Sequence, residues 1–91
     1  MYQHPYHIVD LSKFSFLITG GAGFIGSNLV EYLIRHQAGK IRVLDNLSTG
    51  HLKNIQPFSS NSSFEFINGD IRDPIVCHAA VANMDFVLHQ A

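Results

Sequence analysis

Four glycines within seven residues are the part of this sequence whose types and spacing point most directly to chemistry. Gly20, Gly21, Gly23 and Gly26 follow the apolar run 14–18 and precede an apolar pattern of helical period. A strand, a glycine turn and a helix in this order are typical of a site that binds the pyrophosphate of a dinucleotide. The spacing fits Gly-x-Gly-x-x-Gly from Gly21 and also the wider Gly-x-x-Gly-x-x-Gly from Gly20.

Each glycine has its own expected role. Gly20 and Gly21 allow the chain to leave the strand through backbone angles that a side chain would forbid. Gly23 lets the backbone approach the pyrophosphate, and Gly26 lets the first helical turn pack against the sheet. The free N–H groups at the start of the helix (24–25) then hold the phosphates. The alternative is a glycine-rich turn that serves only the packing of strand and helix.

Asp45 favours the dinucleotide hypothesis, because it ends a second apolar run nineteen residues after Gly26. A carboxylate at this position can accept hydrogen bonds from both ribose hydroxyls of an adenosine and would repel a 2′-phosphate. The alternative is that Asp45 forms a turn or caps a helix ahead of Asn46. With both features in register, the sequence predicts NAD as the cofactor and disfavours NADP.

The composition is that of one small globular domain of 91 residues, with 46% hydrophobic and 14% charged residues. Six Lys and Arg residues are scattered among seven Asp and Glu residues, so no basic patch could follow a nucleic-acid backbone. Six histidines occur without a zinc-ligand spacing, so no metal site is expected. Cys77 is alone, which suits a reducing compartment, and no apolar stretch could span a bilayer. We therefore expect a cytoplasmic protein with no membrane partner.

The pattern of elements predicts an α/β fold, the N-terminal portion of a Rossmann-type doubly wound parallel sheet in the order 3-2-1-4. After a lead-in segment (1–13), the domain is expected to cover 14–91. The expected strands are 14–19, 41–45, 64–68 and 85–90, and the expected helices are 24–36 and 75–84, with one helical turn at 52–55.

Smaller signals fix the ends and faces of these helices. Ile25, Leu29 and Leu33 recur at helical spacing and should face the sheet. Gly39 is expected to stop the first helix. Asp73 and Pro74 are expected to cap and begin the second helix, which would pack through Val76, Ala79, Ala80 and Ala82.

Four blocks of the sequence resemble the NAD-dependent sugar-nucleotide epimerases and dehydratases, a family of extended short-chain dehydrogenases/reductases. The blocks are Thr19–Leu29, Asp45–Gly50, Gly69–Arg72 and Val87–Ala91, in the expected order. The resemblance implies that Asp45 binds the adenosine ribose, that Asp70 and Ile71 hold adenine, and that the last strand borders the nicotinamide-side ribose and pyrophosphate. The full set of expected cofactor-binding residues is Gly20, Gly23, Phe24, Ile25, Gly26, Asp45, Asn46, Ser48, Thr49, Gly50, Asp70, Ile71, Gln90 and Ala91.

Within the family, the blocks are similar to bacterial UDP-N-acetylglucosamine and UDP-hexose 4-epimerases. Such an enzyme oxidises the sugar at C4 with tightly bound NAD and returns the hydride to the opposite face. UDP-hexuronate 4-epimerases and sugar-nucleotide 4,6-dehydratases are the alternatives within the family. Outside it, a nucleotide-binding module without catalysis and, more distantly, an S-adenosylmethionine methyltransferase remain as alternatives.

The family also requires a Tyr-x-x-x-Lys pair, which does not occur in these 91 residues. No catalytic residue is therefore expected in this chain, and we expect it to be a fragment that is inactive alone and self-associates through its last strand. The full-length protein is expected to act on a UDP-sugar and to form a homodimer. The coding sequence beyond Ala91 would decide this.

Overall fold

A computed structural model describes residues 10–48 and 50–90 of the chain. Its strands are β1 (Ser15–Thr19), β2 (Lys40–Asp45), β3 (Phe64–Asn68) and β4 (Phe86–His89), and its α-helices are α1 (Phe24–Arg35) and α2 (Pro74–Val81). Short 3-10 turns lie at η1 (Leu11–Lys13), η2 (Leu52–Asn54) and η3 (Gln56–Phe58). Of the expected lead-in segment, residues 1–9 lie outside the described residues, and Leu11 is buried in the core.

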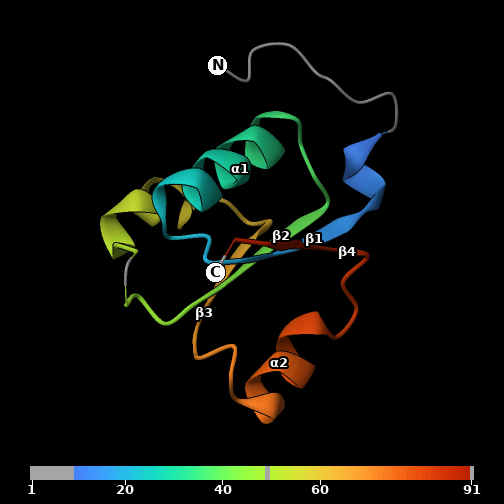
Figure 1. Cartoon of the computed structure of the whole chain (residues 1–91). Helices are drawn as coiled ribbons and strands as arrows, with labels where there is room; N and C mark the ends of the chain where they lie inside the picture. The colour runs from blue at the N-terminus through green and yellow to red at the C-terminus, as the bar shows by residue number, and fades with distance from the viewer. Residues whose placement is uncertain (1–9, 49, 91) are drawn as a thin grey trace.

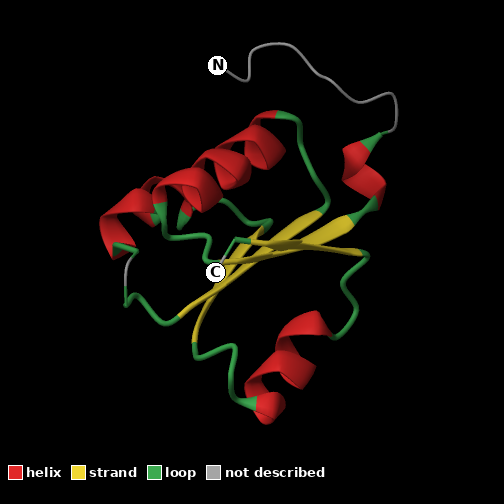
Figure 2. Ribbon diagram, viewed as in Figure 1, coloured by secondary structure: helices red, strands yellow, loops and turns green. Residues whose placement is uncertain are grey.

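The four strands form one parallel sheet in the order β3-β2-β1-β4, which confirms the predicted topology. Helix α1 covers one face of the sheet and α2 covers the other (Figures 1 and 2). Since all strands run in the same direction, their carboxyl ends meet at one edge of the sheet, where ligands bind in folds of this class.

Alternating side chains of the two central strands supply two cores of unequal size. Toward α1, Phe16 and Ile18 of β1 belong to a cluster of eight buried residues that also includes Val30 and Leu33. Toward α2, the buried cluster consists of Leu17, Leu44 and Ala80. The α1 face is therefore the more thoroughly buried of the two.

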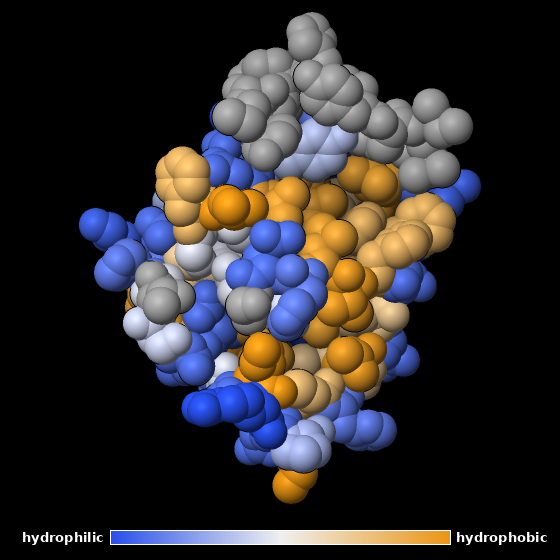
Figure 3. Space-filling view, viewed as in Figure 1, coloured by the Kyte–Doolittle hydropathy of each residue, from blue (hydrophilic) through white to orange (hydrophobic). Residues whose placement is uncertain are grey.

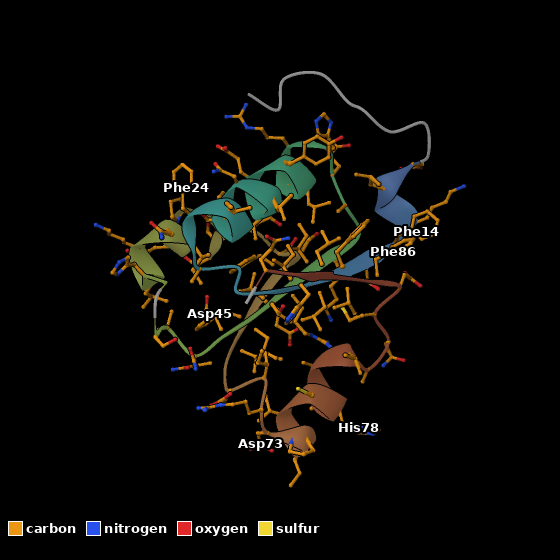
Figure 4. All side chains as sticks on the ribbon, viewed as in Figure 1. Phe14, Phe24, Asp45, Asp73, His78 and Phe86 are labelled. Atoms are coloured by element: carbon orange, nitrogen blue, oxygen red, sulfur yellow. The ribbon has the colours of Figure 1, made fainter. Side chains whose placement is uncertain are left out.

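Helix α1 begins at Phe24 as predicted and ends one residue before the predicted end, but the burial of its first turn differs from the prediction. Ile25 was expected to face the sheet, but its side chain is 63% exposed, because the first turn of α1 stands at the edge where the strands end. Phe24 is also exposed and points away from the sheet (Figure 4). Gly39 was expected to stop the helix, but the chain leaves it earlier: α1 ends at Arg35, and Gln37 adopts the left-handed conformation (φ 59°) common after a helix end.

Helix α2 begins as predicted, since the carboxylate of Asp73 accepts hydrogen bonds from the N–H groups of Ile75 and Val76. Its packing surface is narrower than predicted. Ala80 is buried, whereas Ala79 and Ala82 are exposed, because the short helix presents only one edge to the sheet.

Candidate functional site

A cleft of about 450 Å³ lies at the carboxyl edge of the sheet, a volume suited to a small-molecule ligand. Two groups of residues form most of its lining. The glycine wall consists of Gly20, Gly23, Asp45, Asn46 and Ser48, and the Asp70 wall consists of Gly69, Asp70, Ile71 and Arg72. Leu44 and Gln90 complete the lining.

The glycine turn has the backbone geometry that a close approach requires. Gly20 has a left-handed φ of 74°, and its N–H donates to the carbonyl of Leu44 at 2.8 Å. A Cβ on Gly26 would lie 2.2 Å from the carbonyl oxygen of Gly20, so the first turn of α1 packs directly on the turn. Gly21 was expected to need unusual backbone angles, but Gly20 is the glycine with positive φ among the described residues. Gly21 is instead packed against Val43, whose methyl carbons would lie 2.6 and 2.7 Å from its Cβ.

Gly23 fits an anionic ligand at the start of α1. It is the N-cap of the helix, makes no side-chain capping bond and lines the cleft. A Cβ at this position would lie 3.3 Å from the carbonyl oxygen of Gly20 and meet no other atom within 4 Å. Because the protein itself leaves this space open, the glycine is suited to a ligand that approaches the backbone. The first N–H groups of a helix and their partial positive charge favour a phosphate there.

Asp45, at the end of β2, is hydrogen-bonded to the glycine turn that follows β1. Its side chain is buried and its Oδ2 accepts a hydrogen bond from the N–H of Ala22, inside the glycine turn, at 2.9 Å. Its Oδ1 accepts from the N–H of Leu47 at 2.8 Å, so the turn-forming alternative holds as well. A carboxylate offers about four acceptor sites, and these two bonds leave room for ribose hydroxyls. Figure 4 shows Asp45 at the carboxyl end of β2, of which it is the last residue.

The loop after β2 contributes to the cleft in part. Asn46 and Ser48 line it, and the side-chain oxygen of Asn46 accepts from the N–H of Ser48 at 3.0 Å. Gly50 does not line the cleft. It is buried against the glycine turn, where a Cβ would lie 2.8 Å from the carbonyl carbon of Ala22. Thr49 lies outside the described residues.

Asp70 is held by its neighbour Arg72. Its Oδ1 accepts from the backbone N–H of Arg72 at 2.8 Å and from Nε at 3.1 Å, and its Oδ2 accepts from Nε at 3.1 Å and from Nη2 at 2.7 Å. The hydrogen bonds from Arg72 lower the pKa of Asp70 to about 2, so this carboxylate is ionised at neutral pH.

Thr19 connects β1 to the end of β4 beside the cleft. Its buried Oγ1 lies 2.6 Å from Nδ1 of His89 and accepts from the N–H of Gln90 at 3.2 Å. These contacts fix Gln90 at the end of the cleft. Ala91 lies outside the described residues.

No group of three or more potential metal ligands occurs among residues 10–48 and 50–90. Within the same residues, no helix is long and apolar enough to cross a bilayer.

Comparison with known proteins identifies the family. The sequence model of the NAD dependent epimerase/dehydratase family matches residues 16–91. The chain belongs to this family.

Relatives in the epimerase/dehydratase family carry out different chemistry. The chain is 45% identical over 76 residues to a putative UDP-glucose 4-epimerase of Methanocaldococcus jannaschii, which covers 82% of this chain and 23% of that protein. It is 39% identical over 64 residues to UDP-glucuronic acid decarboxylase 6 of Arabidopsis thaliana, covering 70% of this chain and 19% of that protein. The dTDP-glucose 4,6-dehydratase of Bacillus anthracis, solved in complex with NAD, superposes with a TM-score of 0.78 at 30% identity, covering 86% of this chain and 26% of that one. The chain thus spans about a quarter of the length of these proteins or less.

The cleft of this family member brings together eight of the fourteen expected cofactor residues. These are Gly20, Gly23, Asp45, Asn46, Ser48, Asp70, Ile71 and Gln90. The side chains of Phe24 and Ile25 point to solvent and Gly26 is buried under the turn, so these three would contribute backbone only. Sequence reasoning did not single out Leu44, Gly69 or Arg72. The Gly69–Arg72 block, which resembles the family, contains Arg72 and could have drawn attention to it. The role of Arg72, however, depends on where its guanidinium points.

Proposed function

We propose that this chain forms the NAD-binding part of an NAD-dependent UDP-sugar 4-epimerase. The observation that carries the proposal is the hydrogen bond between the N–H of Ala22 and Oδ2 of Asp45, which joins a phosphate-binding turn to a hydroxyl-accepting carboxylate in one cleft. These are the two features that an adenosine pyrophosphate requires.

Different parts of the cleft would bind different parts of the cofactor. The glycine wall and the start of α1 would hold the pyrophosphate and the adenosine ribose, the Asp70 wall would hold adenine, and Gln90 would border the nicotinamide side. NAD, when bound, supplies a hydride acceptor for C4 of the sugar. The residues that move the proton at the sugar would come from outside this sequence, since no Tyr-x-x-x-Lys occurs in it.

Epimerisation is favoured by the 45% identity to the putative UDP-glucose 4-epimerase. The test incubates the complete gene product, meaning the longest polypeptide that the coding sequence specifies, with UDP-glucose, UDP-N-acetylglucosamine, UDP-glucuronic acid and dTDP-glucose. NMR of the products should show the 4-epimer of a UDP-sugar. A 4-keto-6-deoxy sugar or a decarboxylated sugar would assign the chain to a dehydratase or a decarboxylase and overturn the epimerase proposal.

Asp45 should determine the choice between NAD and NADP. We expect the nucleotide-free gene product to bind NAD more tightly than NADP, and Asp45→Ala to lose about 1–3 kcal/mol of NAD binding through unsatisfied hydroxyl contacts. Calorimetry with both dinucleotides measures this. Asp85→Ala is the matched control, since Asp85 accepts from the N–H of Ser15 at the opposite edge of the sheet. Equal affinity of the unsubstituted protein for NAD and NADP would contradict the assignment.

The isolated 91-residue chain should self-associate through β4. This strand is at one edge of the sheet, Val87 is 50% exposed, and apolar side chains gather over this side of the molecule (Figure 3). An exposed apolar edge strand pairs readily with another chain. Light scattering over a dilution series should show oligomers that Val87→Lys disperses and Ile75→Lys, on α2, does not. A monomer at high concentration would refute this prediction.

A further inference from the structure

The carboxylate of Asp70 is largely occupied by Arg72 in this structure. Each of its two oxygens has two contacts, which come from three N–H groups of Arg72, because the single hydrogen on Nε is shared by both oxygens. A carboxylate has about four acceptor sites in total, and the two contacts of Oδ2 are both with the guanidinium. An adenine amino group that donates to Oδ2, as the proposed function requires, therefore competes with the guanidinium for this oxygen.

The bonds to Arg72 differ in how easily they can be given up. The bond from the backbone N–H of Arg72 to Oδ1 is part of the turn 70–73, in which the N–H of Asp73 also donates to the carbonyl of Asp70 at 3.0 Å. The guanidinium bonds belong to a side chain that is 85% exposed and has no other hydrogen-bond partner among the described residues. Exposed ion pairs of this kind contribute little and are screened by salt. If the guanidinium leaves, Oδ2 loses both of its partners, whereas Oδ1 stays anchored to the backbone.

We propose that Arg72 competes with the adenine base for Asp70. In the nucleotide-free protein the guanidinium of Arg72 binds the Asp70 carboxylate, and when NAD binds it releases Oδ2 to the amino group of adenine. This inference rests on the proposed binding of NAD. It makes Arg72 a specificity-determining residue. Without the guanidinium, the Asp70 carboxylate accepts a hydrogen bond from the 6-amino group of adenine and repels a 6-oxo group. With the guanidinium in place, Arg72 can donate a hydrogen bond to a 6-oxo group, so the site tolerates that base.

The test compares the affinities of the complete gene product for NAD and for nicotinamide hypoxanthine dinucleotide, which carries a 6-oxo group. Arg72→Gln should bind NAD about two- to fivefold more tightly, the range expected for removal of an exposed ion pair, and should bind the hypoxanthine dinucleotide no more tightly than the unsubstituted protein does. Arg35→Gln is the matched control: it removes the same charge from a pair with Glu31 at the far end of α1 and should leave both affinities unchanged.

A double-mutant cycle isolates the competition. In an Asp70→Asn background, Arg72→Gln should no longer raise the affinity for NAD. Weaker NAD binding by Arg72→Gln, or equal changes for the two dinucleotides, would overturn the competitor role. Failure of the unsubstituted protein to bind NAD would instead overturn the proposed function, and this inference with it.

Discussion

The two walls of the cleft are built by different means. In the glycine wall, the carboxylate of Asp45 is buried and receives backbone N–H groups from Ala22 and Leu47. In the Asp70 wall, the carboxylate of Asp70 is partly exposed and most of its bonds come from the side chain of Arg72. Backbone N–H groups therefore hold the first carboxylate, and the guanidinium of Arg72 holds most of the second.

A second arginine, Arg42, holds α2, the helix that follows the Asp70 wall, against the sheet. Arg42 on β2 has a side chain that is only 11% exposed, and its Nε donates to Glu65 of β3 at 2.7 Å. Its Nη1 donates to the carbonyls of Ala80 and Ala82 at the end of α2, at 2.8 and 3.1 Å. These carbonyls have no partners within the helix, so one side chain joins β2, β3 and α2. A wall held by backbone contacts should therefore be rigid and intolerant of substitution, whereas a wall held by side chains should be adjustable.

The largest effect should come from Gly26, which packs against the glycine turn behind the glycine wall. Gly26→Ala places a Cβ 2.2 Å from the carbonyl oxygen of Gly20 and 2.8 Å from the Cα of Gly21, and both are backbone atoms that cannot move aside easily. We expect a loss of about 3 kcal/mol or more in the free energy of unfolding, measured by urea denaturation.

Gly23→Ala is the matched control, because its Cβ would meet the same carbonyl at 3.3 Å. It should change stability by less than about 1 kcal/mol and still weaken NAD binding in the gene product. Equal destabilisation by the two substitutions would show that the glycine turn is not rigid.

Arg42→Met should have an intermediate effect. It removes the contacts that hold α2 and leaves the carbonyls of Ala80 and Ala82 without this charged donor, so we expect a loss of about 2 kcal/mol in the free energy of unfolding. Lys40→Met is the control, because Lys40 reaches Glu65 at 3.8 Å with an exposed side chain, and it should cost about 0.5 kcal/mol or less. If the two variants are equally stable, the contacts of Arg42 do not stabilise the packing of α2 on the sheet.

The Arg42 variant should also change the dependence of stability on pH. The hydrogen bond from Arg42 keeps the pKa of Glu65 below its usual value. The stabilising contribution of ionised Glu65 is therefore present at neutral pH and is lost as the pH falls below about 4. Arg42→Met should flatten this part of the stability curve, and Lys40→Met should largely preserve it.

The smallest effect should come from Thr19, which joins β1 to Gln90 where the cleft ends. Thr19→Val keeps the shape of the side chain and removes the contact with Nδ1 of His89. The N–H of Gln90 keeps its 2.8 Å bond to the backbone carbonyl of Thr19. We therefore expect a loss of about 1 kcal/mol, with Thr19→Ser restoring most of it. A loss as large as that of Gly26→Ala would mean that this contact, and not the glycine turn, organises the cleft.

The sequence by itself determined the sheet order, the glycine turn and the position of Asp45. These are local or periodic properties. The turn needs a residue tolerant of positive φ, which Gly20 provides, and alternating apolar strands with intervening helices admit few parallel topologies. For the same reason the cap at Asp73 was predicted, since a cap depends on neighbours two and three residues away.

Only the tertiary structure decided which contacts the charged side chains make. The partners of Arg42 lie on β3 and at the end of α2, 23 to 40 residues away in the sequence, and no periodic pattern encodes such a meeting. The exposure of Ile25 was decided in the same way, since helical spacing predicts which residues share a face but not where the sheet beneath that face ends. Arg72 could equally have pointed to solvent. Its hold on Asp70 depends on the turn that bends 70–73 and brings the guanidinium back onto the carboxylate.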